Sequence, residues 1–260
     1  MKTKHLATSL LALALAAGGG VASAQTEGSA PTFDNNEAFF GNLHVHTGWS
    51  FDGYINGSPT TPDDAYRWAK GQSIDGGGNG TPLKILKPLD WYAVSDHAEY
   101  IGVMKLMEDD SNPVSKHPLA ADITGDDPDA AFAAYGTISD TIYEGPPDDE
   151  LNDPAIRKSV WTDIVATADE HYAPGRFTTF PAFEWTSAPD WRNLHRVVLF
   201  RDSDHVPEMA LSAMDTSVPA ELWAWMETQR ENGSTLLAVP HNGNASDGMM
   251  FPLGNAYGDV

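Results

Sequence analysis

Two histidines near the start of the chain occupy positions from which they could bind a metal ion. His44 and His46 are separated by one residue and lie near the end of a predicted strand over residues 39–46. Side chains two residues apart on a strand point to the same side, so both imidazoles could reach one ion. The pair by itself is a weak signal, because His-x-His also occurs by accident in surface strands. Its meaning depends on what the other strands carry.

Four further predicted strands each bring a metal-binding side chain close to one end. In a parallel β/α arrangement the C-terminal ends of the strands converge on one face, where the loops carry the reactive groups. Such a succession of strands is difficult to attribute to chance, so the pattern predicts a centre for divalent metal ions. The additional residues are His97 after the strand 89–95, Glu184 at the end of 177–185, His195 within 194–200 and His241 after 234–239.

Two aspartates accompany these histidines. Asp52 follows the His-x-His pair, although an aspartate before Gly53 is also an ordinary turn residue. Asp96 directly precedes His97 and could hold its imidazole in one tautomer, as the partners of metal-bound histidines commonly do. The alternative is that Asp96 caps the helix that is predicted to follow.

The candidates from the later strands have alternatives that do not involve a metal. Glu184 ends an apolar strand, where an unpaired carboxylate is costly to bury. Either a cation or one of two nearby arginines, Arg192 and Arg196, should therefore neutralise it. His195 alternates with core residues of its strand, and His241 follows another apolar strand. Histidines in such places are more often core residues than ligands.

Strands alternate with helices along the chain, which indicates an α/β fold with a largely parallel sheet. The best-marked helix starts with Thr61 as its cap and Pro62 in the first helical position, and it ends at Gly71. Further helices are predicted over residues 98–107, 155–172 and 217–231, the last of them capped by Ser217.

Residues 108–154 interrupt this alternation. They are rich in Asp, Pro and Gly, with one modest helical patch near 130–135. We interpret them as an acidic insertion, which is either a lid over a site or a solvated loop with no role of its own.

The composition limits the classes of partner. A formal net charge of -22 argues against nucleic acid, because binding to phosphate backbones requires clustered Lys and Arg, and it would equally repel an anionic membrane surface. Cysteine is absent, so there is no disulfide framework, and stability must come from core packing and from any bound metal.

The N-terminus has the pattern of a secretory signal. Basic residues precede the apolar run 6–17, and small residues lead up to Ala24, after which cleavage is expected. A membrane anchor is the alternative, but the apolar run is shorter than the ~20 residues that a membrane span needs. We therefore expect a secreted or periplasmic protein, with a flexible start over 25–38 and one domain over 39–260.

Three segments together resemble the polymerase-and-histidinol-phosphatase (PHP) superfamily. They are residues 40–47, 49–52 and 89–100, which contain both the His-x-His pair and the Asp96-His97 pair. They look most like the exported bacterial branch catalogued as domain-of-unknown-function family thirty-six-oh-four. The resemblance runs from about residue 39 to the end of the chain.

This resemblance implies a distorted (β/α)7 barrel of the TIM type that holds two or three metal ions, usually zinc, manganese or iron. It also implies hydrolysis of phosphoesters. Asp96 is interpreted as a residue that supports the ligands and is not one of them. The residues that match the ligand positions of the superfamily are His44, His46, Asp52, His97, Glu184, His195 and His241.

One feature departs from the superfamily pattern. The superfamily has an Asp-x-His pair late in the barrel, and no such pair follows His241. Five strands are predicted where seven are expected. The chain is therefore expected to be the N-terminal part of a longer protein, truncated after about five strands and lacking one or two ligands.

Imidazole and carboxylate ligands without thiolates suit zinc, manganese or iron. Ions of this kind acidify a bound water toward a pKa of ~7 and so provide hydroxide at neutral pH. The sequence lacks a Gly-x-Ser-x-Gly elbow, a Gly-rich phosphate loop and any Cys nucleophile, so covalent catalysis is not expected.

The expected function is therefore a metal-dependent hydrolase acting on a small-molecule ester, most simply a phosphoester. One alternative is another metallohydrolase reaction, on a sulfate ester or an amide. The other is a non-catalytic exported protein that binds metal and grips a glycan with Trp49, Trp185 and Trp191.

Overall fold

A computed structural model describes residues 37–251 of the chain. The expected signal sequence, most of the segment 25–38 and the last nine residues, 252–260, lie outside the described residues. The chain divides after Ala38, and every element described below belongs to Phe39–Val260. Within the described part, no helix combines the length and the apolar character needed to cross a membrane.

The first sheet has three short strands in the order β1-β2-β3. They are β1 (Gly41–Asn42), β2 (Trp91–Tyr92) and β3 (Thr178–Thr179). Both pairings are parallel, as the alternation of strands and helices predicted. The strands are shorter than expected, although hydrogen bonds continue past their ends, for example from the Ser95 amide to the Val45 carbonyl at 2.9 Å.

The second sheet is antiparallel, which differs from the parallel arrangement expected. Its strands, in the order β4-β5-β6, are β4 (Ala182–Trp185), β5 (Arg196–Phe200) and β6 (Leu236–Pro240). The connection from β4 to β5 contains only the 3-10 helix η2 (Pro189–Trp191). A parallel partner would need a crossover of a dozen or more residues, usually with an α-helix, so β5 runs back along β4 instead.

Pro181 divides what was predicted as one strand over 177–185 into β3 and β4, because proline has no amide hydrogen to donate to a ladder. The chain after β2 then pairs in parallel with β4. The Glu184 amide donates to the Asp96 carbonyl at 3.0 Å, and the Ala98 amide donates to the Glu184 carbonyl at 2.9 Å. The two sheets are therefore joined side by side. The described residues form no closed barrel, and the seven-stranded barrel stays a prediction.

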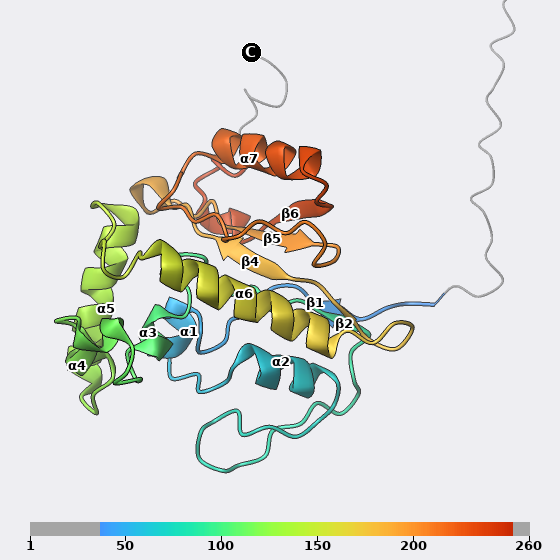
Figure 1. The fold of residues 1–260 in the computed structure, drawn as a ribbon, viewed down its shortest axis with the longest axis horizontal. Coiled ribbons are helices and arrows are strands. Elements are labelled where there is room, and N and C mark those ends of the chain that lie inside the picture. Colours follow the sequence, from blue (N-terminus) through green and yellow to red (C-terminus); the bar gives the residue numbers. More distant parts are fainter. Residues whose placement is uncertain (1–36, 252–260) are drawn as a thin grey trace, which may run out of the picture. The chain divides into compact units, whose positions relative to one another are not determined.

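The two faces of the second sheet have different roles. On one face, aromatic and branched side chains pack against α6 (Pro154–His171) and α7 (Pro219–Glu231), and Figure 1 shows α7 lying along this sheet. The opposite face carries Ala182, Val197 and Leu199, which pack with Ala93, the residue directly after β2. Because side chains alternate along a strand, Glu184 shares the face of Ala182.

Local signals account for most of the helix starts. In α2 (Pro62–Ala69), Thr61 and Asp64 form a capping box, which confirms the predicted start. The predicted cap of α7 is wrong, because its N-cap is Val218 and the Val218 amide bonds the Thr216 hydroxyl. Ser217 instead uses its carbonyl to accept a hydrogen bond from the Ser187 hydroxyl at 2.6 Å.

The helix predicted over 98–107 is reduced to α3 (Val103–Leu106). Tyr100 and Gly102 have φ angles of 47° and 73°, which no helix can accommodate. The Gly102 amide donates to the Trp49 carbonyl at 2.7 Å, so a tertiary contact holds this turn. A short helix that was not predicted, α1 (Phe51–Ile55), contains Asp52.

The insertion 108–154 is more helical than its composition suggested. It contains η1 (Pro113–Lys116), α4 (Ala120–Ile123) and the long helix α5 (Pro128–Tyr143). These elements share a buried core with Phe51 and Tyr100, so the insertion packs on the segments that carry Asp52 and His97.

We expect Gly41→Ala to destabilise the fold by about 1–3 kcal/mol, the usual cost of overpacking. A Cβ at Gly41 would clash with the Trp91 ring and with the Trp91 carbonyl oxygen. The matched control is Gly136→Ala in α5, where a Cβ meets nothing within 4 Å. Gly136→Ala should raise the free energy of unfolding by about 0.5–1 kcal/mol, because alanine loses less backbone entropy than glycine when a helix forms. Urea denaturation measures both, and equal effects would contradict the close packing of β1 on β2.

Candidate metal centre

The seven candidate ligands converge at one edge of the joined sheets. Four strands end at this edge, and β5 begins there because it is antiparallel to its neighbours. His195 therefore reaches the edge from the start of its strand, whereas His241 reaches it from the end of β6, and the His241 amide donates to the His195 carbonyl at 3.0 Å. The converging residues are His44, His46, Asp52, His97, Glu184, His195 and His241.

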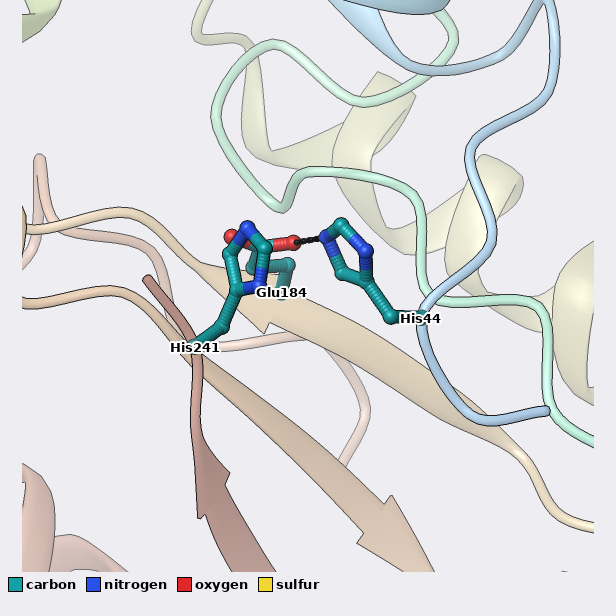
Figure 2. Close-up of side chains that lie close together, drawn as sticks. All are labelled: His44, Glu184 and His241. Atoms are coloured by element: carbon teal, nitrogen blue, oxygen red, sulfur yellow. Dashed lines mark hydrogen bonds and ion pairs between the residues drawn. The ribbon is translucent and has the colours of Figure 1, made fainter. Parts of the chain in front are cut away.

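Glu184 lies at the centre of this cluster. Its side chain is fully buried. Its Oε2 is 2.9 Å from the Nε2 atoms of both His44 and His46, and its Oε1 is 2.8 Å from Nδ1 of His195. Figure 2 shows the rings of His44 and His241 beside this carboxylate, with the hydrogen bond between His44 and Glu184 drawn as a dashed line. Burial alone would raise the pKa of Glu184, but the hydrogen bonds from the imidazoles outweigh it and hold the pKa below its usual range.

Neither nearby arginine neutralises Glu184. Arg192 pairs with Asp190 and Asp247 at 2.9 Å and 3.3 Å. Arg196 is buried on the other face of the sheet, with its guanidinium over the rings of Trp185 and Trp223. Among residues 37–251, the Glu184 carboxylate is therefore surrounded by imidazoles.

A second carboxylate, Asp52, faces the same histidines from α1. Its Oδ1 is 3.1 Å from Nδ1 of His46, and its Oδ2 is 3.6 Å from Nε2 of His97. Burial alone lowers the pKa of His46, but the hydrogen bonds to Asp52 and Glu184 raise it to about 10. Both ring nitrogens of His46 thus face carboxylate oxygens, an arrangement that stabilises a cation at this position.

The ligand atoms form three groups, in each of which every ligand atom lies within 4.8 Å of the others. This spacing and the mixture of imidazoles and carboxylates fit divalent ions such as zinc, manganese or iron. The described residues could therefore hold metal ions, and which ions they hold stays a prediction. The groups are His44-Glu184-His241, His46-Asp52-His97 and His97-Glu184-His195.

The cluster is open to solvent on the side of His44 and His241. The His44 side chain is 36% exposed, whereas that of His97 is 7% exposed. The rings of His44 and His241 stack with centroids 3.7 Å apart. Burial is the main cause of the lowered pKa of His241.

Asp96 supports the centre in a different way from that predicted. It is buried and accepts hydrogen bonds from the Thr47 amide at 2.5 Å and the Thr47 hydroxyl at 2.8 Å. Burial raises the pKa of Asp96 to about 6, and the Thr47 hydrogen bonds oppose the rise. Asp96 thus holds the segment that carries His44 and His46, rather than fixing the tautomer of His97.

Sequence reasoning missed three residues that contact the candidate ligands. Ser50 donates to Oδ1 of Asp52 at 2.6 Å and contacts Nδ1 of His46 at 3.0 Å. Thr186 contacts Nδ1 of His97 through its hydroxyl. Glu99 places Oε2 at 4.0 Å from the same nitrogen. Only Glu99 had a usable signal, as an acidic residue two positions after His97.

The fold and the cluster together define an α/β protein with a candidate centre for divalent metal ions. The chain belongs to the family described as "Protein of unknown function (DUF3604)", whose model matches residues 33–260. No curated protein and no solved structure matches the chain.

Proposed function

We propose that this protein is an exported metal-dependent hydrolase that cleaves small-molecule esters, most simply phosphoesters. The observation that carries the proposal is the contact of one buried carboxylate, Glu184, with three imidazoles. We also propose, from the three matching sequence segments, that the chain belongs to the PHP superfamily and its barrel class.

Some of the candidate ligands would contact more than one ion. Glu184 and His97 each belong to two of the three ligand groups, so ions bound there would be neighbours that share ligands. Divalent ions in such a site supply a water of lowered pKa and positive charge for the leaving oxygen. The hydrogen bond of Ser50 orients the His46 imidazole, and that of Asp96 holds Thr47 next to it, which is the contribution expected of residues behind the ligands.

An anionic ester would bind on the open side of the cluster. The net charge of -22 disfavours the approach of an anion to the protein as a whole. The His44 side chain is 36% exposed and its ring stacks on that of His241, so these two rings are the protein groups that an ester would meet first. This arrangement suits a reaction in which metal ions bound in the cluster offset the negative charge of the ester.

In the alternative of a glycan-binding protein, one of the three tryptophans is not accessible to a ligand. Trp185 is fully buried and its Nε1 donates to the Thr216 carbonyl at 2.9 Å. Trp49 is half-buried, and Trp191 is 60% exposed. A flat aromatic platform built from all three is therefore excluded, and a non-catalytic binding role is an outcome of the experiment below.

The test is turnover of a panel of chromogenic phosphate, sulfate and amide substrates with zinc, manganese or iron(II). We expect phosphoester turnover that a chelator abolishes, that metal restores, and that His46→Ala lowers by roughly a hundredfold or more. His205→Ala, an exposed histidine outside the ligand groups, is the matched control. Turnover of sulfate esters or amides alone would replace the phosphoesterase assignment. Metal binding without turnover of any substrate would favour the binding protein.

A further inference from the structure

Glu99 is a buried carboxylate for which the proposed reaction has no direct use. Its side chain has no exposed surface. Its Oε1 accepts hydrogen bonds from the Ala213 amide at 2.6 Å and the Thr186 amide at 3.3 Å. Its Oε2 is buried and has no hydrogen-bond partner among the described residues. Leaving a buried carboxylate oxygen without a hydrogen-bond partner costs free energy, so the position of Glu99 needs a functional explanation.

The unpaired oxygen faces the back of His97. Oε2 of Glu99 is 4.0 Å from Nδ1 of His97, and the other ring nitrogen, Nε2, faces Asp52 in the ligand cluster. The Thr186 hydroxyl contacts the same Nδ1 and donates to the Glu184 carbonyl at 3.3 Å. With its hydrogen used in that way, the hydroxyl is left to accept a hydrogen from Nδ1.

Two sets of contacts connect Glu99 with His97. By accepting from the Thr186 amide it fixes the residue whose hydroxyl receives the Nδ1 hydrogen. Its own negative charge, a short distance from Nδ1, favours a hydrogen on that nitrogen over one on Nε2. A histidine can bind a metal through Nε2 only when Nε2 carries no hydrogen, so the tautomer decides whether His97 is a ligand.

We propose that Glu99 is a positioning residue that keeps a hydrogen on Nδ1 of His97 and thereby presents Nε2 to the metal centre. The inference rests on the proposed metal site. It assigns to Glu99 the role that the sequence had suggested for Asp96, whose oxygens bond Thr47 instead.

The decisive variant is Glu99→Gln. A glutamine can keep its carbonyl oxygen on the Ala213 and Thr186 amides, which places its NH2 group where Oε2 now faces His97. A donor in that position favours Nδ1 without a hydrogen, and so favours a hydrogen on Nε2. We expect the affinity for one zinc or manganese ion to fall by about 10–100-fold, the usual cost of losing a partner behind a ligand.

Nitrogen-15 NMR of histidine-labelled protein shows directly whether Nδ1 of His97 carries a hydrogen, and His97→Asn identifies the signal. The wild-type chain, stripped of metal, is expected to have the Nδ1 hydrogen, and Glu99→Gln to lack it. Glu227→Gln makes the same change of charge on the exposed face of α7 and should alter neither the signal nor the affinity.

Two results would overturn the proposal. One is wild-type protein in which Nδ1 of His97 has no hydrogen, a measurement that needs no variant to fold and no enzymatic activity. The other is Glu99→Gln protein that loses thermal stability but keeps both the Nδ1 hydrogen and the wild-type metal affinity, because Glu99 would then be structural only. Failure of the proposed function is distinguishable, since it would leave the tautomer of His97 unchanged.

Discussion

Glu184→Gln is expected to remove tight metal binding and to lower metal-dependent kcat/KM by more than about a hundredfold. Losing residues that only support a ligand already costs about 10–100-fold. Glu184 contributes more than support, because its two oxygens contact three imidazoles and it belongs to two of the three ligand groups. Glutamine replaces one acceptor oxygen by an NH2 group, which would face an imidazole nitrogen that must itself be free to bind metal.

Metal content after gel filtration and isothermal titration with zinc or manganese measure the first effect, and turnover of the best substrate measures the second. Glu227→Gln again controls for the change in charge, since Glu227 pairs only with Arg230 at 3.2 Å in the described structure and lies outside the ligand groups. If Glu184→Gln bound as many ions as the wild type with the same affinity, the centre would have to be placed elsewhere.

Metal affinity is expected to rise steeply with pH, by about tenfold per pH unit and so by about a hundredfold between pH 6 and 8. The pKa of His46 is raised to about 10, because the effects of Asp52 and Glu184 exceed that of burial. Below that pH the ring holds a hydrogen on both nitrogens, and an ion must displace one of them. Raising the pH removes this competition and strengthens binding, whereas lowering it weakens binding.

Titrations in buffers with different ionisation enthalpies give the number of protons released for each ion bound. We expect about one proton near pH 7.5 from the site that includes His46. His46→Gln should bind metal more weakly and lose this proton release. An affinity that stayed constant between about pH 6 and 8 would mean that His46 does not hold a second hydrogen in the metal-free protein, and would contradict the raised pKa of His46.

Local patterns in the sequence were sufficient for several elements and for the identities of the candidate ligands. Thr61 and Pro62 mark the start of α2 as predicted, since capping depends on residues only a few positions apart. Most of the candidate ligands were found because they lie in or directly after a predicted strand, and such runs are recognisable without knowing what they pack against. Their assembly into three groups agrees with the expectation that these strand ends converge. That they bind metal stays a prediction.

Other predictions failed where distant contacts override local preference. The helix over 98–107 does not form in full, because Tyr100 and Gly102 take left-handed backbone angles and Gly102 bonds the distant Trp49 carbonyl. Ser217 looked like a helix cap, but its carbonyl bonds Ser187 and the helix begins after Val218. The propensity of a short segment is weak compared with several tertiary hydrogen bonds.

The sequence alone determined which side chains are available for metal chemistry and that they lie near the ends of strands. Only the tertiary structure decided how those side chains meet. The antiparallel direction of β5 places His195 at the common edge from the beginning of its strand, and the folding of residues 96–99 against β4 aims Glu99, not Asp96, at His97. Strand direction and buried hydrogen bonds join residues far apart in the chain, so no local pattern encodes them.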